Sequence, residues 1–427
     1  MNEQMIRKNN MKIYPIYKMF AWDFLFYYAI IFLFLSQAKG FSASEILLAD
    51  SIYAIFRVIF QIPCINIVDL LKKQKSLLLG NLLVSIGLVL LIVGNSMSCL
   101  ILLYFIQAIG YNLKGICEPT ILSDSIPESS SSSKIFSKID GKGSGYYYMF
   151  NAFSFFLAGF LYVINPYIPI ILCLVCCLIS TIISLAFYEP TPNNVQPKDK
   201  STGFIEYYKE LFYTSKKIIK SKRLKSLLII SLIFWGILSV STSLRSSIMV
   251  DIGIPEQYFG IIVGIMQIVS SITALKQDWF HKKFRNRLLS WFSLSISLSF
   301  ILTGLLVVCN INFTVSLISV LFTVMLLGIV KGPYPTLIQK YLNSFSNPNV
   351  NTQIFAIKSL LENLGRILLS LLSAFLLNIT TTSYAFIIIG CILFIIFIFL
   401  LDYMKTKVGL KPEEYPEEDL IFSNEIK

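Results

Sequence analysis

The stretch Asp69-Leu70-Leu71-Lys72-Lys73-Gln74-Lys75 separates two long apolar runs with one carboxylate and three lysines. The second half of the chain contains a similar stretch, Asp278-Trp279-Phe280-His281-Lys282-Lys283-Phe284-Arg285, which also lies between apolar runs. In each stretch an aspartate ends one apolar run and cations begin the next. This pattern is typical of a short cytoplasmic loop between two membrane-spanning helices.

The composition indicates a polytopic membrane protein. Hydrophobic residues make up 55% of the 427 residues and charged residues only 14%, and a water-soluble globule has too little interior for so many apolar side chains. Runs of about 20 apolar residues, enough to cross a bilayer core of about 30 Å, can be placed twelve times. The approximate spans are 15–38, 45–68, 76–95, 98–122, 143–163, 167–188, 226–250, 256–275, 287–308, 313–340, 351–377 and 383–403.

The basic residues lie on one side of these spans. About 28 of the 36 Lys and Arg fall in segments that we assign to the cytoplasm, whereas the opposite loops contain only Lys39. This asymmetry explains the net charge of +12 without a nucleic acid partner. We therefore expect a multi-pass plasma membrane protein, inserted in the lipid bilayer with both termini in the cytoplasm.

Cysteine and histidine usage argues against metal, cofactor or catalytic chemistry. The eight cysteines lie within or at the edges of apolar runs, where a free thiol packs like a small hydrophobe. His281 is the only histidine, which excludes histidine-based metal clusters and Ser-His-Asp catalysis. We expect no cofactor, no metal and no enzymatic activity.

Landmarks in the first half recur in the same order in the second. Trp22-Asp23 in the first half corresponds to Trp235-Gly236 in the second. The segment Gly110-x-x-x-Lys114-Gly115-x-x-x-Pro119-Thr120 corresponds to Gly328-x-x-Lys331-Gly332-x-x-Pro335-Thr336. Together with the two loop stretches, these landmarks predict a duplicated six-helix unit. The predicted domains are a first bundle (1–188), a linker (189–224), a second bundle (225–403) and an acidic cytoplasmic tail (404–427). The linker is either an amphipathic helix on the inner leaflet or a solvated connection.

The loop stretches resemble the motif G-x-L-a-D-R-x-G-R-R/K between helices 2 and 3 of major facilitator superfamily (MFS) transporters. Asp69, Lys73 and Lys75 occupy the acidic and basic positions of the motif, while Ile65 and Lys72 replace its two glycines. The resemblance covers residues 15–403. It implies an all-α membrane protein with twelve transmembrane helices in two pseudo-symmetric six-helix bundles. The weaker second copy of the motif contains Asp278, Lys282 and Lys283.

Ionisable residues inside the predicted spans are the candidate functional residues. Each costs about 2.5–3.5 kcal/mol at the middle of a membrane, and they are Asp23, Asp50, Arg57, Lys114, Glu118, Arg245, Lys331, Lys358, Glu362 and Arg366. Helical spacing pairs Lys114 with Glu118 and aligns Lys358, Glu362 and Arg366. The family resemblance implies that Arg57, Asp69, Lys73, Lys75, Asp278, Lys282, Lys283, Glu362 and Arg366 are gate and interface residues. Purely structural ion pairing is the alternative.

Three of the charges lack an opposite charge at helical spacing: Asp23, Arg245 and Lys331. In the family, helices 1, 4, 7 and 10 line the central cavity. The resemblance therefore implies a substrate cavity with Asp23, Lys114, Arg245 and Lys331. Proton coupling through Asp23 and Glu118 is expected because both are buried carboxylates, whose protonation depends on burial and on the neighbouring charge of Lys114. The alternative for Lys114, Arg245 and Lys331 is that their side chains extend to a membrane interface.

These observations predict a secondary active transporter that moves a small solute by alternating access, as a monomer and coupled to protons. The charges expected in the cavity leave an excess of cations, which favours an organic anion or an amphoteric metabolite. The alternative is efflux of drugs or toxic compounds by proton antiport. A membrane enzyme would need a polar catalytic loop, and a channel or receptor would lack the duplicated loops.

Overall fold

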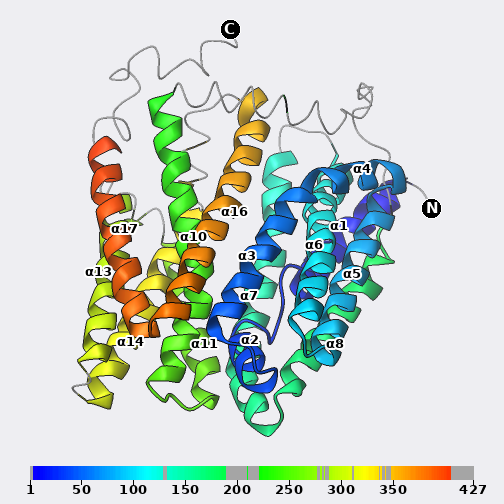
Figure 1. Cartoon of the computed structure of the whole chain (residues 1–427). Coiled ribbons are helices and arrows are strands. Elements are labelled where there is room, and N and C mark those ends of the chain that lie inside the picture. Colours follow the sequence, from blue (N-terminus) through cyan, green and yellow to red (C-terminus); the bar gives the residue numbers. More distant parts are fainter. Residues whose placement is uncertain are drawn as a thin grey trace. The chain divides into compact units, whose positions relative to one another are not determined.

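The computed structural model describes residues 3–127, 132–188, 221–276, 288–309, 312–335 and 348–404, together with 209, 279, 280, 283, 337, 338 and 342. All regular elements in these residues are helices (Figure 1). Their bounds are α1 Glu3–Ala21, α2 Ile31–Leu33, the π-helix η1 Phe34–Ala38, α3 Ala43–Ile59, α4 Gln61–Leu71, α5 Lys73–Val93, α6 Met97–Ser125, α7 Ser132–Ile164, α8 Tyr167–Ser184, α10 Lys222–Asp251, α11 Gln257–Leu275, α13 Leu288–Val308, α14 Phe313–Lys331, α16 Pro348–Ile379 and α17 Thr382–Met404.

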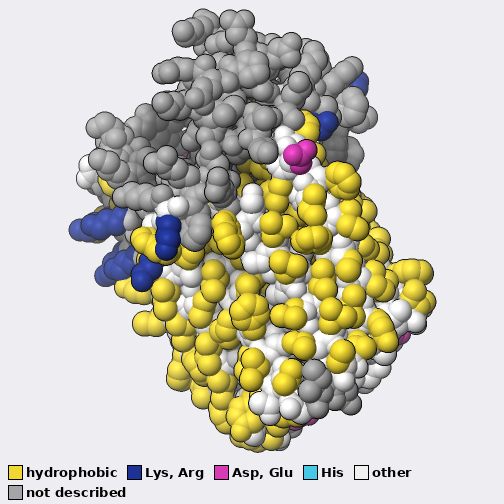
Figure 2. Space-filling view, turned by 90° about the vertical axis from the view of Figure 1, so that its left-hand side faces the viewer, with side chains coloured by type: hydrophobic (Ala, Val, Ile, Leu, Met, Phe, Trp, Pro, Cys, Tyr) yellow, Lys and Arg dark blue, Asp and Glu magenta, His cyan; other side chains and the backbone are white. Residues whose placement is uncertain are grey.

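The helices confirm the predicted all-α polytopic membrane fold. In the described part of the chain, ten helices are long and apolar enough to cross a membrane, and α3 and α4, bent by 50°, form an eleventh candidate as a pair. Large apolar side chains such as Trp291 of α13 and Phe399 of α17 are exposed. The face in Figure 2 is covered by hydrophobic side chains, with Lys and Arg above them, as expected for a surface in contact with lipid.

The first predicted span, 15–38, is not one continuous helix. It consists of the end of α1, an irregular stretch from Trp22 to Ile30, and then α2 and η1. Asp23 accepts a hydrogen bond from the backbone N–H of Phe24 at 2.8 Å, and such local bonds compete with helical ones. Phe26 has a positive φ of 60°. The helix is therefore interrupted where the sequence places a carboxylate among apolar residues.

The chain forms two compact units with the same internal packing. Unit 1 comprises Met1–Gly40, Ile52–Phe204 and Glu256–Ile261, and unit 2 comprises the rest. In unit 1, α1 packs on α6, α7 and α8, and α5 packs on α6 and α8; in unit 2, α10 packs on α14, α16 and α17, and α13 packs on α14 and α17. These pairings correspond one to one in chain order. The duplicated landmarks of the sequence thus correspond to a duplicated packing pattern.

The domain boundaries read from the sequence remain a prediction. Most of the linker 189–224 and all of the tail beyond residue 404 lie outside the described residues. Two short segments join the unit formed mainly by the other half of the sequence: Phe41–Ser51 belongs to unit 2, and Glu256–Ile261 belongs to unit 1.

Glycines allow helices within each unit to approach closely. A Cβ atom on Gly80 of α5 would lie 2.9 Å from the carbonyl oxygen of Gly110 in α6, and one on Gly236 of α10 would lie 2.7 Å from that of Gly365 in α16. Because lipid provides no hydrophobic drive for helix association, close packing through small residues contributes much of the attraction. Gly110, a landmark of the sequence repeat, therefore has a packing role.

Lys72 connects α4 to α5 in a backbone conformation that side chains disfavour. Its φ is 70° and its ψ is 158°, a region that is populated almost only by glycine. The MFS motif has its second glycine at this position. Lys72 therefore adopts a backbone conformation for which the family motif has a glycine.

We predict that Lys72→Gly stabilises the protein by about 1–2 kcal/mol, because glycine adopts this conformation without the strain of a Cβ atom. Thermal or denaturant unfolding of the purified protein in detergent measures the effect. Gln74→Gly is the control, since Gln74 lies within the first turn of α5 and glycine there should leave stability unchanged or lower it. Equal effects of both substitutions would contradict the assignment of strain to Lys72.

Candidate solute and coupling sites

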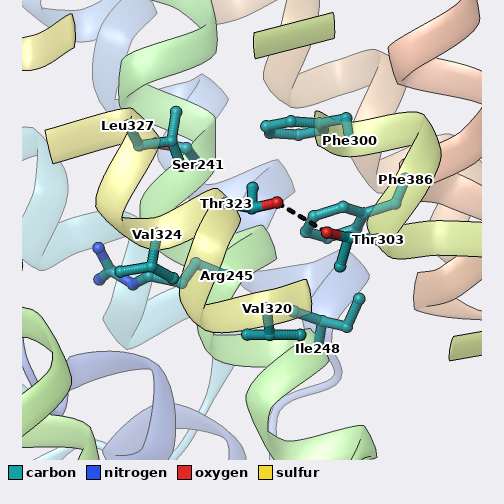
Figure 3. Close-up of a pocket in the computed structure, with 10 residues that line it drawn as sticks. All are labelled: Ser241, Arg245, Ile248, Phe300, Thr303, Val320, Thr323, Val324, Leu327 and Phe386. Carbon is teal, nitrogen blue, oxygen red and sulfur yellow. Dashed lines mark hydrogen bonds between the residues drawn. The ribbon is translucent and has the colours of Figure 1, made fainter. Parts of the chain in front are cut away.

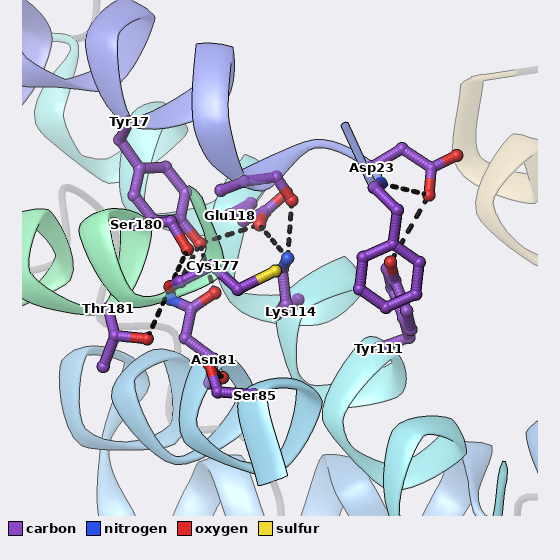
Figure 4. Close-up of polar contacts among 12 residues, drawn as sticks. Tyr17, Asp23, Asn81, Ser85, Tyr111, Lys114, Glu118, Cys177, Ser180 and Thr181 are labelled. Atoms are coloured by element: carbon purple, nitrogen blue, oxygen red, sulfur yellow. Dashed lines mark hydrogen bonds and ion pairs between the residues drawn. The ribbon is translucent and has the colours of Figure 1, made fainter. Parts of the chain in front are cut away.

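A buried polar network in unit 1 surrounds Glu118 of α6 (Figure 4). The Tyr17 hydroxyl of α1 donates to Glu118 Oε1 at 2.8 Å and accepts from the Asn81 amide of α5 at 3.1 Å. Lys114 Nζ lies 4.0 Å from Glu118 Oε1. The sequence indicated Lys114 and Glu118, one helical turn apart. It gave no signal for Tyr17 or Asn81, which come from other helices.

Lys114 also binds the end of α1. Its ammonium donates to the carbonyl oxygen of Ala21 at 2.5 Å and lies 5.1 Å from the ring centroid of Tyr111. Ala21 is the last residue of α1, and carbonyls at a helix end lack helical partners and favour a nearby cation. Only 5% of Lys114 is exposed, so its side chain does not extend to a surface. The ammonium therefore contacts the helix end and faces Glu118.

Asp23 lies in the irregular stretch after α1, among aromatic side chains. Its Oδ1 accepts hydrogen bonds from the hydroxyls of Tyr28 at 2.7 Å and Tyr111 at 3.3 Å, in addition to the Phe24 N–H. Trp22, next to it, packs on the ring of Tyr147 at 5.0 Å. These three donors are neutral groups.

An ion pair that the sequence analysis did not single out lies close to this network. Lys18 Nζ is 2.5 Å from Asp140 Oδ1 and 4.4 Å from the ring centroid of Trp22. Lys18 belongs to α1 and Asp140 to α7, so helical spacing along one segment carries no signal for the pair.

Arg245 of α10 is the principal buried cation of unit 2. Only 4% of it is exposed, so its side chain does not extend to a surface. Its Nη1 contacts the sulfur of Met266 at 3.4 Å, while Nε and Nη2 have no hydrogen-bond partner among the described residues. No described carboxylate forms an ion pair with it.

A small cavity lies beside the aliphatic part of Arg245 (Figure 3). Its volume is about 10 Å³, room for about one water molecule. The hydroxyls of Thr303 and Thr323 form a 2.7 Å hydrogen bond on one side of it, and the guanidinium extends away from this pair. The cavity therefore borders the aliphatic part of the arginine side chain, and the guanidinium does not lie in it.

Two ion pairs in unit 2 involve α16. Lys358 Nζ lies 2.6 Å from Glu362 Oε1, and Arg366 Nη2 lies 2.9 Å from Asp50 Oδ1. Asp50 thus has its charged partner on another helix, and Arg57 contacts the Tyr53 hydroxyl at 3.4 Å. Glu362 also accepts a hydrogen bond from Ser231 of α10 at 2.8 Å.

The remaining predicted residues lie at helix ends. Lys73, the first residue of α5, pairs with Asp124 near the end of α6. Asp69 and Lys75 are exposed on either side of that connection, and Lys331 is the exposed last residue of α14. The ammonium of Lys283 lies 4.9 Å from the ring centroid of Trp279. Asp278 and Lys282 lie outside the described residues.

Comparisons with known proteins identify the family. The family model of the Major Facilitator Superfamily matches residues 16–343. The chain therefore belongs to this superfamily, and the resemblance read from the loop motif is confirmed. Its class is that of membrane transporters that move small solutes. A comparison with curated proteins gives no significant match.

Solved transporters share the fold at low sequence identity. A variant of the nucleoside transporter NupG has a TM-score of 0.72 at 14% identity, covering 93% of this chain and 100% of that one. A POT family transporter in complex with 5-aminolevulinic acid has a TM-score of 0.66 at 16% identity, covering 95% and 96%. A bacterial homologue of the human lysosomal transporter Spinster has a TM-score of 0.67 at 14% identity, covering 96% and 99%.

We predict that the Asp50–Arg366 pair stabilises the packing of α16. Asp50→Asn should lower the free energy of unfolding by about 1–3 kcal/mol, because it removes the negative charge that accepts the 2.9 Å hydrogen bond of Arg366. A double-mutant cycle with Arg366→Gln, followed by thermal unfolding, measures the coupling. Glu45→Gln is the control, because Glu45 is an exposed residue at the start of α3, the helix that contains Asp50, and its side chain bonds Ser42. Additive effects of the two substitutions at Asp50 and Arg366 would contradict the prediction.

Proposed function

We propose that this protein is a proton-coupled secondary transporter of a small organic anion or amphoteric metabolite in the plasma membrane. The solute cavity contains Asp23, Lys114, Arg245 and Lys331. Protons bind at Asp23 and Glu118. The gate and interface residues are Arg57, Asp69, Lys73, Lys75, Asp278, Lys282, Lys283, Glu362 and Arg366.

The buried charge of Arg245 supports an anionic solute. Glu118, Glu362 and Asp50 each have a cationic partner within 4.0 Å. Arg245 has no carboxylate partner among the described residues. An unmatched buried cation is costly, so a bound anion would be stabilised, whereas a cationic solute would add to the repulsion. Arg245 is the single observation that carries the proposal.

The network around Glu118 supports proton coupling. A carboxylate within a membrane span exchanges its charge for a neutral acid when it binds a proton, which changes its attraction for a neighbouring cation. Lys114 has two available partners, the Ala21 carbonyl at 2.5 Å and Glu118 at 4.0 Å. Protonation of Glu118 would favour the contact with Ala21, and loss of the proton would favour Glu118. The proton would thereby change the contacts at the end of α1, which is the form of coupling that alternating access requires.

Efflux of cationic compounds by proton antiport is the second candidate. The observation that favours it is the position of Asp23 among aromatic rings, an environment that attracts organic cations. Binding of cationic dyes that is abolished by Asp23→Asn and unaffected by Arg245→Met would establish this alternative.

Contacts at the helix ends of unit 1 support the predicted topology. Lys39 donates to Asn95 Oδ1 at 2.7 Å, joining two loops that we assign to the outer side. Arg7 donates to the carbonyl of Asp124 at 2.9 Å and Asn10 to that of Tyr188 at 2.7 Å, joining segments that we assign to the cytoplasm. The basic residues are concentrated on the side of the Arg7 and Asn10 contacts, and by the positive-inside rule we assign this side, with both termini, to the cytoplasm.

Cysteine labelling tests this topology. In a cysteine-free version, single cysteines at Asn95 and Thr381, which are exposed, should react with an impermeant maleimide applied to intact cells. A cysteine at Asn194, in the predicted linker, should react only after the membrane is permeabilised. Labelling of Asn194 in intact cells would contradict the assignment.

We predict that Glu118→Gln abolishes uptake driven by a pH gradient while exchange of solute across the membrane continues. The amide retains the size of the carboxyl group but does not exchange a proton. Proteoliposomes with a panel of radiolabelled organic anions, with and without a gradient, provide the measurement. Tyr17→Phe, which removes a hydrogen bond to Glu118 but retains the carboxylate, should keep uptake dependent on the gradient. Accumulation by Glu118→Gln equal to that of the wild type would exclude Glu118 as the proton carrier.

A further inference from the structure

Along one edge of the Arg245 guanidinium, the hydrogen-bond donors have no partner among the described residues. Nη1 is directed at the sulfur of Met266, a weak acceptor, at 3.4 Å. The two nitrogens without partners among the described residues are Nε and Nη2. In a guanidinium these atoms carry parallel N–H groups on the same edge, spaced to match two oxygens of one acid.

The described contact of the guanidinium is an uncharged thioether. Arg245 and Val324 of α14 line the same small cavity, and Met266 packs against Gly328 of α14. No described carboxylate forms an ion pair with Arg245. One positive charge in such surroundings is neutralised by one negative charge, whereas a dianion would leave an excess of negative charge.

We propose that Arg245 binds a singly charged carboxylate of the solute through a bidentate pair from Nε and Nη2. The inference rests on the proposed transport function and specifies the chemical group that the transporter recognises. Sulfate and the phosphate dianion offer similar pairs of oxygens, but their second negative charge has no described partner beside Arg245. The carboxylate is therefore the group that fits both the donor geometry and the charge.

Met266 is a neighbour of the guanidinium whose side chain can adapt to a bound solute. Since Arg245 is almost fully buried, a solute reaches its open edge only when a neighbouring side chain moves. Met266 has a flexible, unbranched side chain that adapts to different packing and makes only a weak contact with Nη1. Displacing it costs little compared with the charge-assisted hydrogen bonds that a carboxylate forms.

Thermal unfolding of the purified full-length protein in detergent tests the proposal. The probes are potassium acetate, hexanoate and benzoate, with acetamide, hexanamide and benzamide as neutral counterparts and potassium chloride, phosphate and sulfate as ionic controls. We expect at least one carboxylate to raise the Tm of the wild type in a saturable manner, by about 2 °C or more. Its amide counterpart and the inorganic salts should not do so.

Substitutions separate binding from structure. Arg245→Lys keeps the charge but loses the fork of donors, and the affinity for the protecting carboxylate should fall by about 10- to 100-fold. Arg245→Met removes the unmatched charge at similar size, so the protein without probe should have a Tm equal to or above that of the wild type, and carboxylates should no longer protect it. Arg7→Lys is the matched control at an arginine outside the site, and it should bind carboxylates like the wild type.

Several results would overturn the proposal: no protection by any of the three carboxylates, protection that persists in Arg245→Met, or stronger protection by phosphate than by carboxylates. A lower Tm of Arg245→Met without probe would also overturn it, because the guanidinium would then have a structural role and its charge would not be unmatched. Uptake by proteoliposomes distinguishes failure of this inference from failure of the proposed function. If the wild type transports and Arg245→Met transports equally well, only the carboxylate site is refuted; if the wild type transports no solute, the proposed function is refuted.

Discussion

The constraint that shapes this protein is that a charge or a backbone polar group within the membrane must find its partner inside the protein. The break after α1 shows how the constraint is met. Ending a helix at Ala21 leaves carbonyl groups without helical partners, and Lys114 provides a cationic donor there. Asp23, two residues later, is held by hydroxyls and a backbone N–H. The irregular stretch and the buried charges around it therefore depend on each other.

The two units meet the same constraint differently. In unit 1, acids and cations from α1, α6 and α7 form pairs supported by hydroxyl and amide groups. Unit 2 contains paired charges on α16 and one deeply buried cation, Arg245, whose described contact is a sulfur atom. The duplicated helical framework therefore has unequal polar contents in its two units.

The packing that supports these sites depends on small residues. Gly80 with Gly110, and Gly236 with Gly365, bring helix backbones together within each unit. Close backbone approach fixes the relative positions of the helices more tightly than long flexible side chains would. Tyr17, Asn81 and Glu118 meet within hydrogen-bond distance because the helices carrying them pack closely. Lys72 shows the opposite situation, a strained residue at the connection between α4 and α5.

The sequence by itself determined the class of protein. The apolar spans, the one-sided basic residues and the repeated loop motif depend on composition and on spacing along the chain, and the family match to residues 16–343 confirms the interpretation. Ion pairs between residues one helical turn apart could also be predicted, as for Lys114 with Glu118 and Lys358 with Glu362. Partners from different helices were not: Asp50 pairs with Arg366, and Tyr17 bonds Glu118, through contacts that tertiary packing alone creates. The interruption of the first span and the open edge of Arg245 likewise became visible only in three dimensions, because hydrogen-bond satisfaction depends on which atoms surround a group and not on its neighbours in sequence.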